Sequence, residues 1–162
     1  MARQKKSTKE YSILQETKIS EYLGWKTVSA SGARPCNPGD IKGDMWLGEC
    51  KTHIHQTDHI GISKLVWIKI RTEAKSLMKR PALFTDCGTQ RLEDTWAIVP
   101  ARFFPNVSCV QLPIKEALAK ISFKLNDDTV KNIGDSACKI SIDNESLLIM
   151  KLSTFKLLLD EV

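Results

Sequence analysis

The sequence predicts a mixed α/β fold in which helices flank a central β-sheet, and three observations support this class. Residues 7–23 and 64–79 carry apolar side chains at helical spacings of three and four. Residues 81–85 and 95–99 are short apolar runs rich in strand formers, typical of strands in the middle of a sheet. Residues 40–51 contain the turn residues of a β-hairpin.

The first helix is expected to begin at Ser7 or Thr8, either of which can cap its start, and to end at Gly24. The positions expected to face the core are Leu14 (or Gln15), Ile19, Tyr22 and Leu23. Residues 1–9 are polar and basic, so we expect a disordered tail, with a DNA-contacting arm as the alternative.

A strand over residues 26–30 should lead into the small-residue turn Ser31-Gly32-Ala33-Arg34. Small side chains let a phosphate backbone come close, and exposed backbone N–H groups can hold it. Ser31 and Arg34 are therefore candidate DNA contacts, and ordinary turn residues are the alternative interpretation.

The hairpin over residues 40–51 is expected to turn at Gly43-Asp44. Its strands are expected at residues 40–41 and 46–51. Side chains two apart on a strand share a face, so Glu49 and Lys51 should project together. A short turn would fold Asp40 back toward Glu49, which brings two carboxylates and an ammonium to one place.

This combination indicates metal-dependent chemistry on phosphate. One or two carboxylates suit Mg²⁺, whose coordination is completed by water and substrate phosphate. We therefore expect Mg²⁺, held by Asp40 and Glu49, with Mn²⁺ as a substitute. The corresponding reaction is phosphodiester hydrolysis, in which Lys51 stabilises charge or positions the attacking water. A surface salt bridge on an ordinary hairpin is the alternative.

The second helix, over residues 64–79, is expected to have Ser63 as its N-cap. Its inward stripe is expected to be Trp67, Ile70, Ala74, Leu77 and Met78. Another face is basic and carries Lys64, Arg71, Lys75 and Lys79. Lys64, Arg71 and Lys75 are candidate contacts to DNA phosphate, with a solvated helix face as the alternative.

The rest of the chain is expected to complete the fold or to form an interface. The expected elements are a helical turn at 101–104, a short helix at 113–121, a hairpin of strands 138–142 and 146–152 across Asp143-Asn144, and a final helix at 155–160 capped by Thr154. Three successive leucines at 157–159 indicate burial against a partner. We divide the chain into a tail (1–9), a core (10–104) and a C-terminal extension of the same domain or an interface (105–162).

The composition favours a polyanionic partner and a reducing compartment. The formal net charge is +5, and five dispersed cysteines argue for free thiols, so we expect a cytoplasmic protein. No apolar run approaches the roughly 18 residues of a membrane span, and no secretory signal is recognisable. His53 and His55 are candidate zinc ligands, but they lack a partner at a useful spacing, so a polar loop is favoured.

Three motifs together resemble one superfamily of nucleases. They are Ser31-Gly32-Ala33, Pro38-Gly39-Asp40-Ile41 and Leu47-Gly48-Glu49-Cys50-Lys51-Thr52. This pattern is similar to the core of the PD-(D/E)XK nucleases and, more narrowly, to the archaeal-type Holliday junction resolvases and their phage-encoded relatives. The resemblance runs from about Glu16 to about Phe104. Gly48 departs from the pattern, because an aliphatic residue is usual there.

The resemblance implies a restriction-endonuclease-like core with the site at one edge of the sheet. It implies that a glutamate of the first helix joins the site as a metal or water ligand, and the alignment selects Glu16, with Glu10 and Glu21 as alternatives. It also implies a Mg²⁺-dependent endonuclease that acts as a homodimer on four-way DNA junctions during recombination and repair, leaving 5′-phosphate ends. Its setting would be the cytoplasm of a bacterial or archaeal cell, or of a phage host.

Other functions stay open at this point. Within the nucleases they are flap cleavage, nicking and sequence-specific restriction, the last of which needs base readout for which no recognition helix is obvious. A non-catalytic DNA-binding or assembly protein is the alternative of another class, although the intact Asp40, Glu49 and Lys51 argue against it. A basic α/β domain without a nucleic-acid role would show no salt-sensitive DNA binding.

Overall fold

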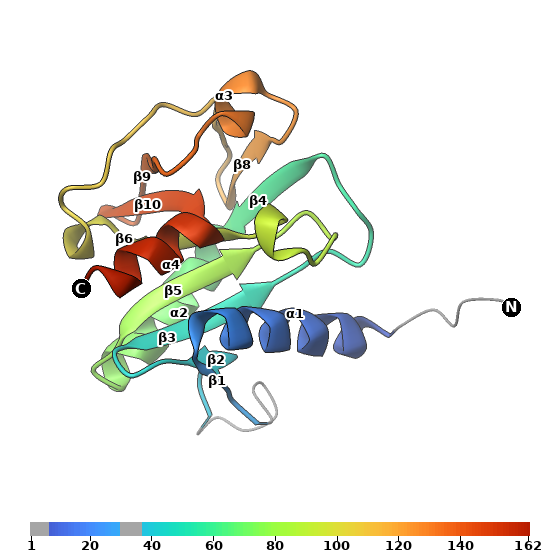
Figure 1. Cartoon of the computed structure of the whole chain (residues 1–162), viewed down its shortest axis with the longest axis vertical. Coiled ribbons are helices and arrows are strands. Elements are labelled where there is room, and N and C mark those ends of the chain that lie inside the picture. Colours follow the sequence, from blue (N-terminus) through green and yellow to red (C-terminus); the bar gives the residue numbers. More distant parts are fainter. Residues whose placement is uncertain (1–6, 30–36) are drawn as a thin grey trace, which may run out of the picture.

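The computed structural model describes residues 7–29 and 37–162. These residues form a mixed seven-stranded sheet, a three-stranded sheet and four α-helices (Figure 1), which confirms the expected α/β class. In chain order the elements are α1 (Thr8–Leu23), β1 (Lys26–Thr27), β2 (Ile41–Lys42), β3 (Trp46–Lys51), β4 (His59–Ser63), α2 (Lys64–Ser76), β5 (Arg80–Thr85), η1 (Leu92–Asp94), β6 (Trp96–Pro100), η2 (Ala101–Phe103), β7 (Lys115–Glu116), β8 (Lys120–Lys124), α3 (Asp128–Lys131), β9 (Cys138–Ile142), β10 (Glu145–Lys151) and α4 (Leu152–Asp160).

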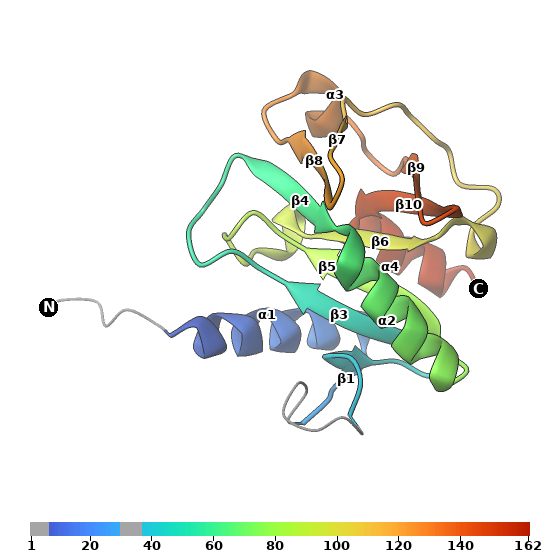
Figure 2. The ribbon, with the colours of Figure 1, turned by 180° about the vertical axis from the view of Figure 1, so that it is seen from behind.

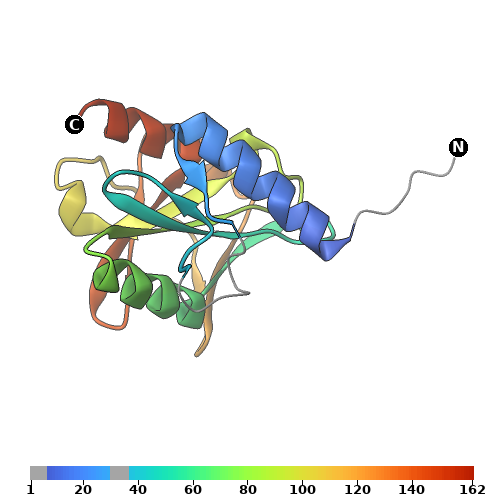
Figure 3. The same ribbon diagram turned by 90° about the horizontal axis from the view of Figure 1, so that it is seen from below.

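The large sheet has the strand order β1-β2-β3-β5-β6-β10-β9, and β3 and β5 are its parallel pair. Figure 3 shows α1 (blue) and α4 (red) on one face of this sheet and α2 (green) on the other. One core lies on the side of α2 and the small sheet and contains Trp67, Trp96 and Phe123. The second core lies on the side of α1 and α4 and contains Trp46 and Phe155. The sheet is therefore buried on both faces, so charged side chains on β3 need partners.

Helix α1 begins and ends as the sequence predicts. The Ser7 hydroxyl accepts a hydrogen bond from the Glu10 N–H (3.3 Å), and the Glu10 carboxylate accepts one from the Ser7 N–H, which together form a capping box. Gly24 adopts a φ of 71° as the C-cap. Gln15, not Leu14, is the buried member of the predicted pair, and this places a polar side chain beside β3.

The hairpin β2–β3 forms as expected, with its first strand shifted by one residue so that Asp40 immediately precedes β2. The described part of the predicted strand 26–30 is shorter, because β1 covers Lys26–Thr27 alone. A Cβ on Gly48 would lie 2.7 Å from Ile41 Cγ1 and 2.8 Å from Phe84 Cε2. The departure from the nuclease pattern at Gly48 thus allows two core side chains to close over β3.

Helix α2 begins at the predicted N-cap, since the Ser63 hydroxyl accepts from the Val66 N–H (3.3 Å). It ends at Ser76, and Met78 has a φ of 54°, so the chain reverses into β5. Figure 2 shows α2 crossing β3 and β5. The prediction that Leu77 and Met78 face the core is wrong: they are 37% and 91% exposed, because they lie beyond the helix.

Residues 113–121 do not form the predicted helix, and β7 and β8 form a hairpin there instead. Ile121 and Phe123 of β8 are buried, whereas Lys120 and Lys124 are exposed, which is the period of a strand. Strand β8 also pairs with β4, which the sequence analysis did not predict, to build the small sheet.

The predicted C-terminal hairpin is present as β9–β10, and both Asp143 and Asn144 have positive φ angles in its two-residue turn. Strand β10 pairs with β6, so this hairpin extends the large sheet. Helix α4 begins at Leu152, not after Thr154; the Thr154 hydroxyl lies inside the helix and donates to the Gly134 carbonyl (3.3 Å), so the predicted cap is wrong. Over residues 7–29 and 37–162 no helix has the length and apolarity needed to cross a bilayer.

Candidate active site

Asp40 lies where β2 separates from β3. Its backbone N–H donates to the Gly48 carbonyl (2.8 Å), and its Oδ2 accepts from the Cys50 N–H (2.8 Å). The carboxylate therefore replaces the backbone partner that β2 would otherwise have supplied to β3. This hydrogen bond fixes Asp40 beside the middle of β3, as the hairpin pattern predicted.

Glu49 is the most deeply buried carboxylate of the predicted set, with its side chain 3% exposed. Lys51 Nζ lies 2.6 Å from Glu49 Oε1, and Lys69 Nζ of α2 lies 3.4 Å from both carboxylate oxygens. A buried carboxylate is tolerated when it is paired with cations. Glu49 and Lys51 do project from the same face of β3, toward α2.

Glu16 of α1 is electrostatically coupled to this group. The pKa of Glu16 is raised from 4.5 to about 7, first by burial and then by the negative charges of Asp40 and Glu49, while Lys51 opposes them. Of the two alternatives weighed from the sequence, Glu10 forms the capping box with Ser7, and Glu21 is exposed. Glu16, which the alignment selects, is coupled to both carboxylates.

The electrostatics of β3 reflect this concentration of acid. Burial acts to lower the pKa of Lys51, but the hydrogen bond to Glu49 and the charges of Glu49 and Asp40 hold it above its ordinary value. The buried Cys50 thiol has a pKa raised first by burial and then by Asp40, Glu16 and Glu49. Lys51 therefore stays protonated at neutral pH, whereas Cys50 stays a neutral thiol.

A buried network that the sequence analysis missed holds the end of β3. Gln15 Nε2 donates to the Lys51 carbonyl (2.8 Å) and to Asp86 Oδ2 (3.3 Å). Asp86, which is fully buried, also accepts from the Thr52 hydroxyl (2.6 Å) and the Gly88 N–H (2.8 Å). The available sequence signal was an acid directly after the strand that pairs with β3. This network fixes the backbone from which Lys51 projects.

Helix α2 contributes Lys69 and Glu73, which the sequence analysis did not assign to the site. Glu73 Oε2 accepts from the Gly39 N–H (3.2 Å), next to Asp40, and Glu73 Oε1 lies 3.7 Å from Lys69 Nζ. Their spacing of four residues was a signal that they share one helix face. That face, rather than the predicted basic one, lies over β3.

The predicted DNA contacts of α2 lie away from the carboxylates or are paired. Lys64 Nζ lies 2.7 Å from Glu116 Oε1, and Arg71 lies 2.6 Å from Asp143 Oδ2 at the β9–β10 turn. Lys75 is exposed and has no ion pair within the described ranges. Glu116 and Asp143 reduce the positive charge of this helix face. Contact with DNA stays a prediction for Lys64, Arg71 and Lys75. Ser31 and Arg34 lie outside the described residues.

The donor set fits a divalent cation bound through few protein ligands. In the described part of the chain no group of three or more His, Cys, Asp or Glu side chains is arranged to hold a metal by itself. The oxygens of Asp40 and Glu49 match Mg²⁺, which keeps several waters and uses one or two carboxylates. Glu16 is close enough to add a third carboxylate, since the charges of Asp40 and Glu49, after burial, raise its pKa. The rings of His53 and His59 have their centroids 6.2 Å apart, and a polar loop stays the favoured interpretation of His53 and His55.

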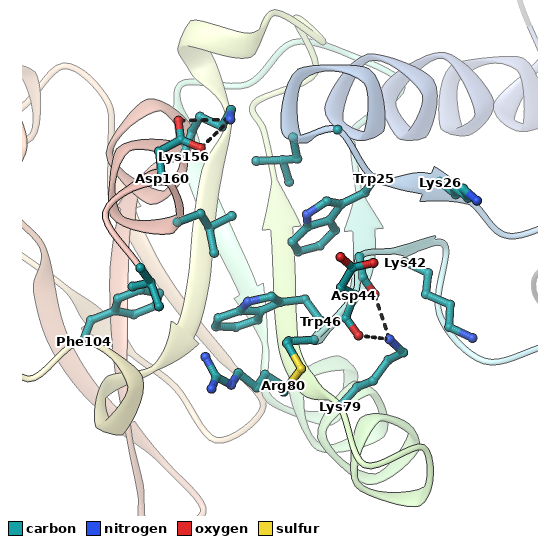
Figure 4. Close-up of a pocket in the computed structure, with 16 residues that line it drawn as sticks. Trp25, Lys26, Lys42, Asp44, Trp46, Lys79, Arg80, Phe104, Lys156 and Asp160 are labelled. Atoms are coloured by element: carbon teal, nitrogen blue, oxygen red, sulfur yellow. Dashed lines mark hydrogen bonds and ion pairs between the residues drawn. The ribbon is translucent and has the colours of Figure 1, made fainter.

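A larger cavity, of about 850 Å³, lies at the opposite end of β3 (Figure 4). Trp25 and Trp46 stack in its wall with ring centroids 6.4 Å apart. The cations around it are Lys26, Lys42, Lys79, Arg80 and Lys156. Three of them already have partners in the protein, since Lys79 donates to two turn carbonyls, Arg80 lies over Phe103, and Lys156 pairs with Asp160. This cavity has no cluster of coupled carboxylates.

Comparisons with protein-family models, with curated proteins and with solved structures found no match for this chain.

Proposed function

We propose that this protein is a Mg²⁺-dependent DNA endonuclease of the PD-(D/E)XK type, with a restriction-endonuclease-like core. The observation that carries the proposal is the convergence of Asp40, Glu49 and Lys51 at the point where β2 leaves β3, with Lys51 Nζ 2.6 Å from Glu49. The coupling of Glu16 to both carboxylates is a second support. The mixed sheet with flanking helices is the architecture that the resemblance implies, and it is a third support.

The residues divide the work as follows in this proposal. Asp40 and Glu49, with Glu16 beside them, would hold Mg²⁺ (or Mn²⁺), which when bound supplies stabilisation of negative charge on phosphate. Lys51 Nζ, kept protonated by its acidic neighbours, donates a hydrogen bond that positions the attacking water or a phosphate oxygen. Lys69 Nζ offsets the charge of Glu49 from the α2 side. Gln15 and Asp86 keep the end of β3 in place.

The proposed substrate is branched DNA, and a four-way junction is the first candidate because of the resemblance to junction resolvases. One site cuts one strand, so paired symmetric cuts need a homodimer, and two-fold symmetry is the commonest arrangement of oligomers. The net charge of +5 supports a polyanionic substrate. The free thiols of Cys50, Cys87, Cys109 and Cys138 support the proposed cytoplasmic setting.

The test compares wild type with Asp40→Asn on a labelled four-way junction, a flap, a nicked duplex and a plain duplex, each with Mg²⁺, with Mn²⁺ and with EDTA. We expect paired cuts on the junction that disappear in EDTA and in the variant. Equal cutting of several branched forms would replace the resolvase by a general structure-selective nuclease. Binding without cutting of any substrate would overturn the catalytic proposal and favour a non-catalytic DNA-binding protein. Sedimentation of the protein with and without junction would test the homodimer.

A further inference from the structure

A second, smaller cavity of about 250 Å³ adjoins the candidate active site on the side away from Asp40. Lys51 lines it, together with His53 after β3, Gly61 and Ser63 of β4, and Lys120 of β8. Its lining contains two lysines and a histidine but no Asp or Glu. Its volume is enough for a phosphate group and several waters, since a liquid water takes up about 30 Å³. The chemistry of the lining therefore suits an anion.

Lys120 reaches this cavity because Gly61 has no side chain. A Cβ on Gly61 would lie 2.3 Å from Lys120 Cε and 2.8 Å from Lys120 Nζ. In the antiparallel pair β4–β8, Lys120 is the register partner of Ser63, and Gly61 lies two residues before Ser63 on β4. The side chain of Lys120 therefore extends from β8 over Gly61 of β4.

The ammonium of Lys120 is not neutralised by the protein. Within residues 7–29 and 37–162 it makes no ion pair, whereas Lys64, the residue after its register partner, is paired with Glu116 (2.7 Å). Lys51 has Glu49 as its partner on one side and the cavity on the other. The cavity is therefore lined by an unpaired cation together with a histidine and a second lysine, next to the carboxylates.

We propose that this cavity binds a phosphate group of the substrate DNA, next to the phosphate that is cut, with Lys120 as a phosphate-binding residue. The inference rests on the proposed endonuclease function and deepens it, because it gives the small sheet a role in holding the strand. Lys51 lies between the two sites, so a phosphate held by Lys120 places its neighbour on the backbone at the carboxylates. Gly61 is the residue that permits this position of the ammonium.

The experiment measures binding of the labelled four-way junction by fluorescence anisotropy in EDTA, where no strand is cut, over a series of KCl concentrations. Lys120→Ala should weaken binding about five- to tenfold at low salt. It should also reduce the slope of log K against log[KCl] by about 0.9, as expected for one lost phosphate contact. Lys139→Ala is the matched control, since Lys139 is an exposed lysine of β9 at the far edge of the large sheet.

Gly61→Ala provides a second variant that keeps the net charge. The new methyl group would displace the flexible end of Lys120 rather than the backbone, so the protein should keep its melting temperature while binding weakens. A slope for Lys120→Ala equal to that of wild type, or an equal loss in Lys139→Ala, would overturn the inference, as would wild-type binding by Gly61→Ala. Cleavage by wild type in Mg²⁺ is scored separately. If wild type cuts DNA and the slopes are unchanged, the phosphate cavity fails while the proposed function stands; if no DNA is cut, the proposed function fails whatever the slopes.

Discussion

The two ends of β3 differ in size, charge and composition. The amino-terminal end opens on the larger cavity, where Trp25 and Trp46 stack and three of the five nearby cations contact carbonyls, a ring or a carboxylate of the protein. The carboxyl-terminal end carries Glu49 and Lys51, coupled to Asp40 and Glu16, and opens on a cavity of less than a third of that volume. The larger cavity is thus lined by cations and aromatic rings, whereas the coupled carboxylates lie at the end with the smaller one.

Under the proposed function, the reaction therefore takes place at the end with the smaller cavity. Aromatic side chains at the first end bury apolar area and hold the edge of the sheet against α4. Carboxylates lie close together at the second end, where burial first and then the charges of Asp40 and Glu49 raise the pKa of Glu16. Strain of this electrostatic kind is typical of functional sites, so the smaller end is the candidate for catalysis.

The largest expected effect comes from the acidic end. Asp40→Asn keeps the shape of the side chain but removes the charge, so cleavage of junction DNA should fall roughly 10³-fold or more, about 4 kcal/mol of transition-state stabilisation. Asp44→Asn removes an acid at the other end of the hairpin and should cut as wild type does. Initial rates of cleavage in Mg²⁺ measure both. Equal losses of cleavage rate in the two variants would show that the two ends of the hairpin do not differ in function.

The aromatic end should respond in stability instead. Trp46 is 5% exposed and contacts Phe103, Phe104 and Phe155. Trp46→Ala should lower the free energy of unfolding by about 3–5 kcal/mol, measured by urea denaturation. The cleavage rate per folded molecule should stay near that of wild type at low temperature. A small change in stability would contradict the structural role assigned to this end.

Lysines at the two ends provide the third comparison. Lys51→Ala should reduce the cleavage rate about 10²-fold, because it removes the donor next to Glu49. Lys79→Ala removes the donor to the Gly43 carbonyl and should cost about 1 kcal/mol of stability without a loss of rate. Single-turnover cleavage and urea denaturation separate the two effects. A rate loss in Lys79→Ala as large as in Lys51→Ala would contradict the assignment of the reaction to the carboxyl-terminal end of β3.

The smallest effect is a pH dependence at Glu16. Its pKa in the folded protein, about 7, exceeds the ordinary value of 4.5, so folding favours the protonated form. Its contribution is therefore most favourable below pH 4.5 and is lost as the pH rises through about 7. Without metal at pH 8, Glu16→Gln should be more stable by about 1 kcal/mol after allowance for solvent screening, or roughly 2–4 °C in Tm. The gain should vanish near pH 4.5, and a gain that is constant with pH would disprove the coupling.

Local signals in the sequence predicted much of the fold. The cap at Ser7, the glycine at the end of α1, and the Asp143-Asn144 turn each act within a few residues, so a sequence pattern can reveal them. The predicted helix 113–121 was wrong because β8 is short and its apolar partners, such as Trp96 for Phe123, come from elsewhere in the chain. The predicted end of α2 was wrong for a similar reason, because the chain must reverse there to pair β5 with β3.

The residues of the candidate site also fall into a predictable and an unpredictable group. Asp40, Glu49 and Lys51 were predictable because a hairpin and a two-residue strand period bring them together within twelve positions. Lys69 and Glu73 of α2 and the buried pair of Gln15 and Asp86 were not, because they reach the site across 20 to 71 positions of sequence. Helix packing, rather than any motif, selects which face of α2 covers β3.

The sequence by itself determined the α/β class, the hairpin and the chemical identity of the acid–lysine group, since these depend on periodicity, turn residues and side-chain type. The tertiary structure alone decided that Lys69 also neutralises Glu49, and that Lys120 lines the same cavity as Lys51. Those outcomes depend on distances between segments far apart in the chain. Such distances follow from the packing of the two faces of the sheet, which a local pattern does not encode.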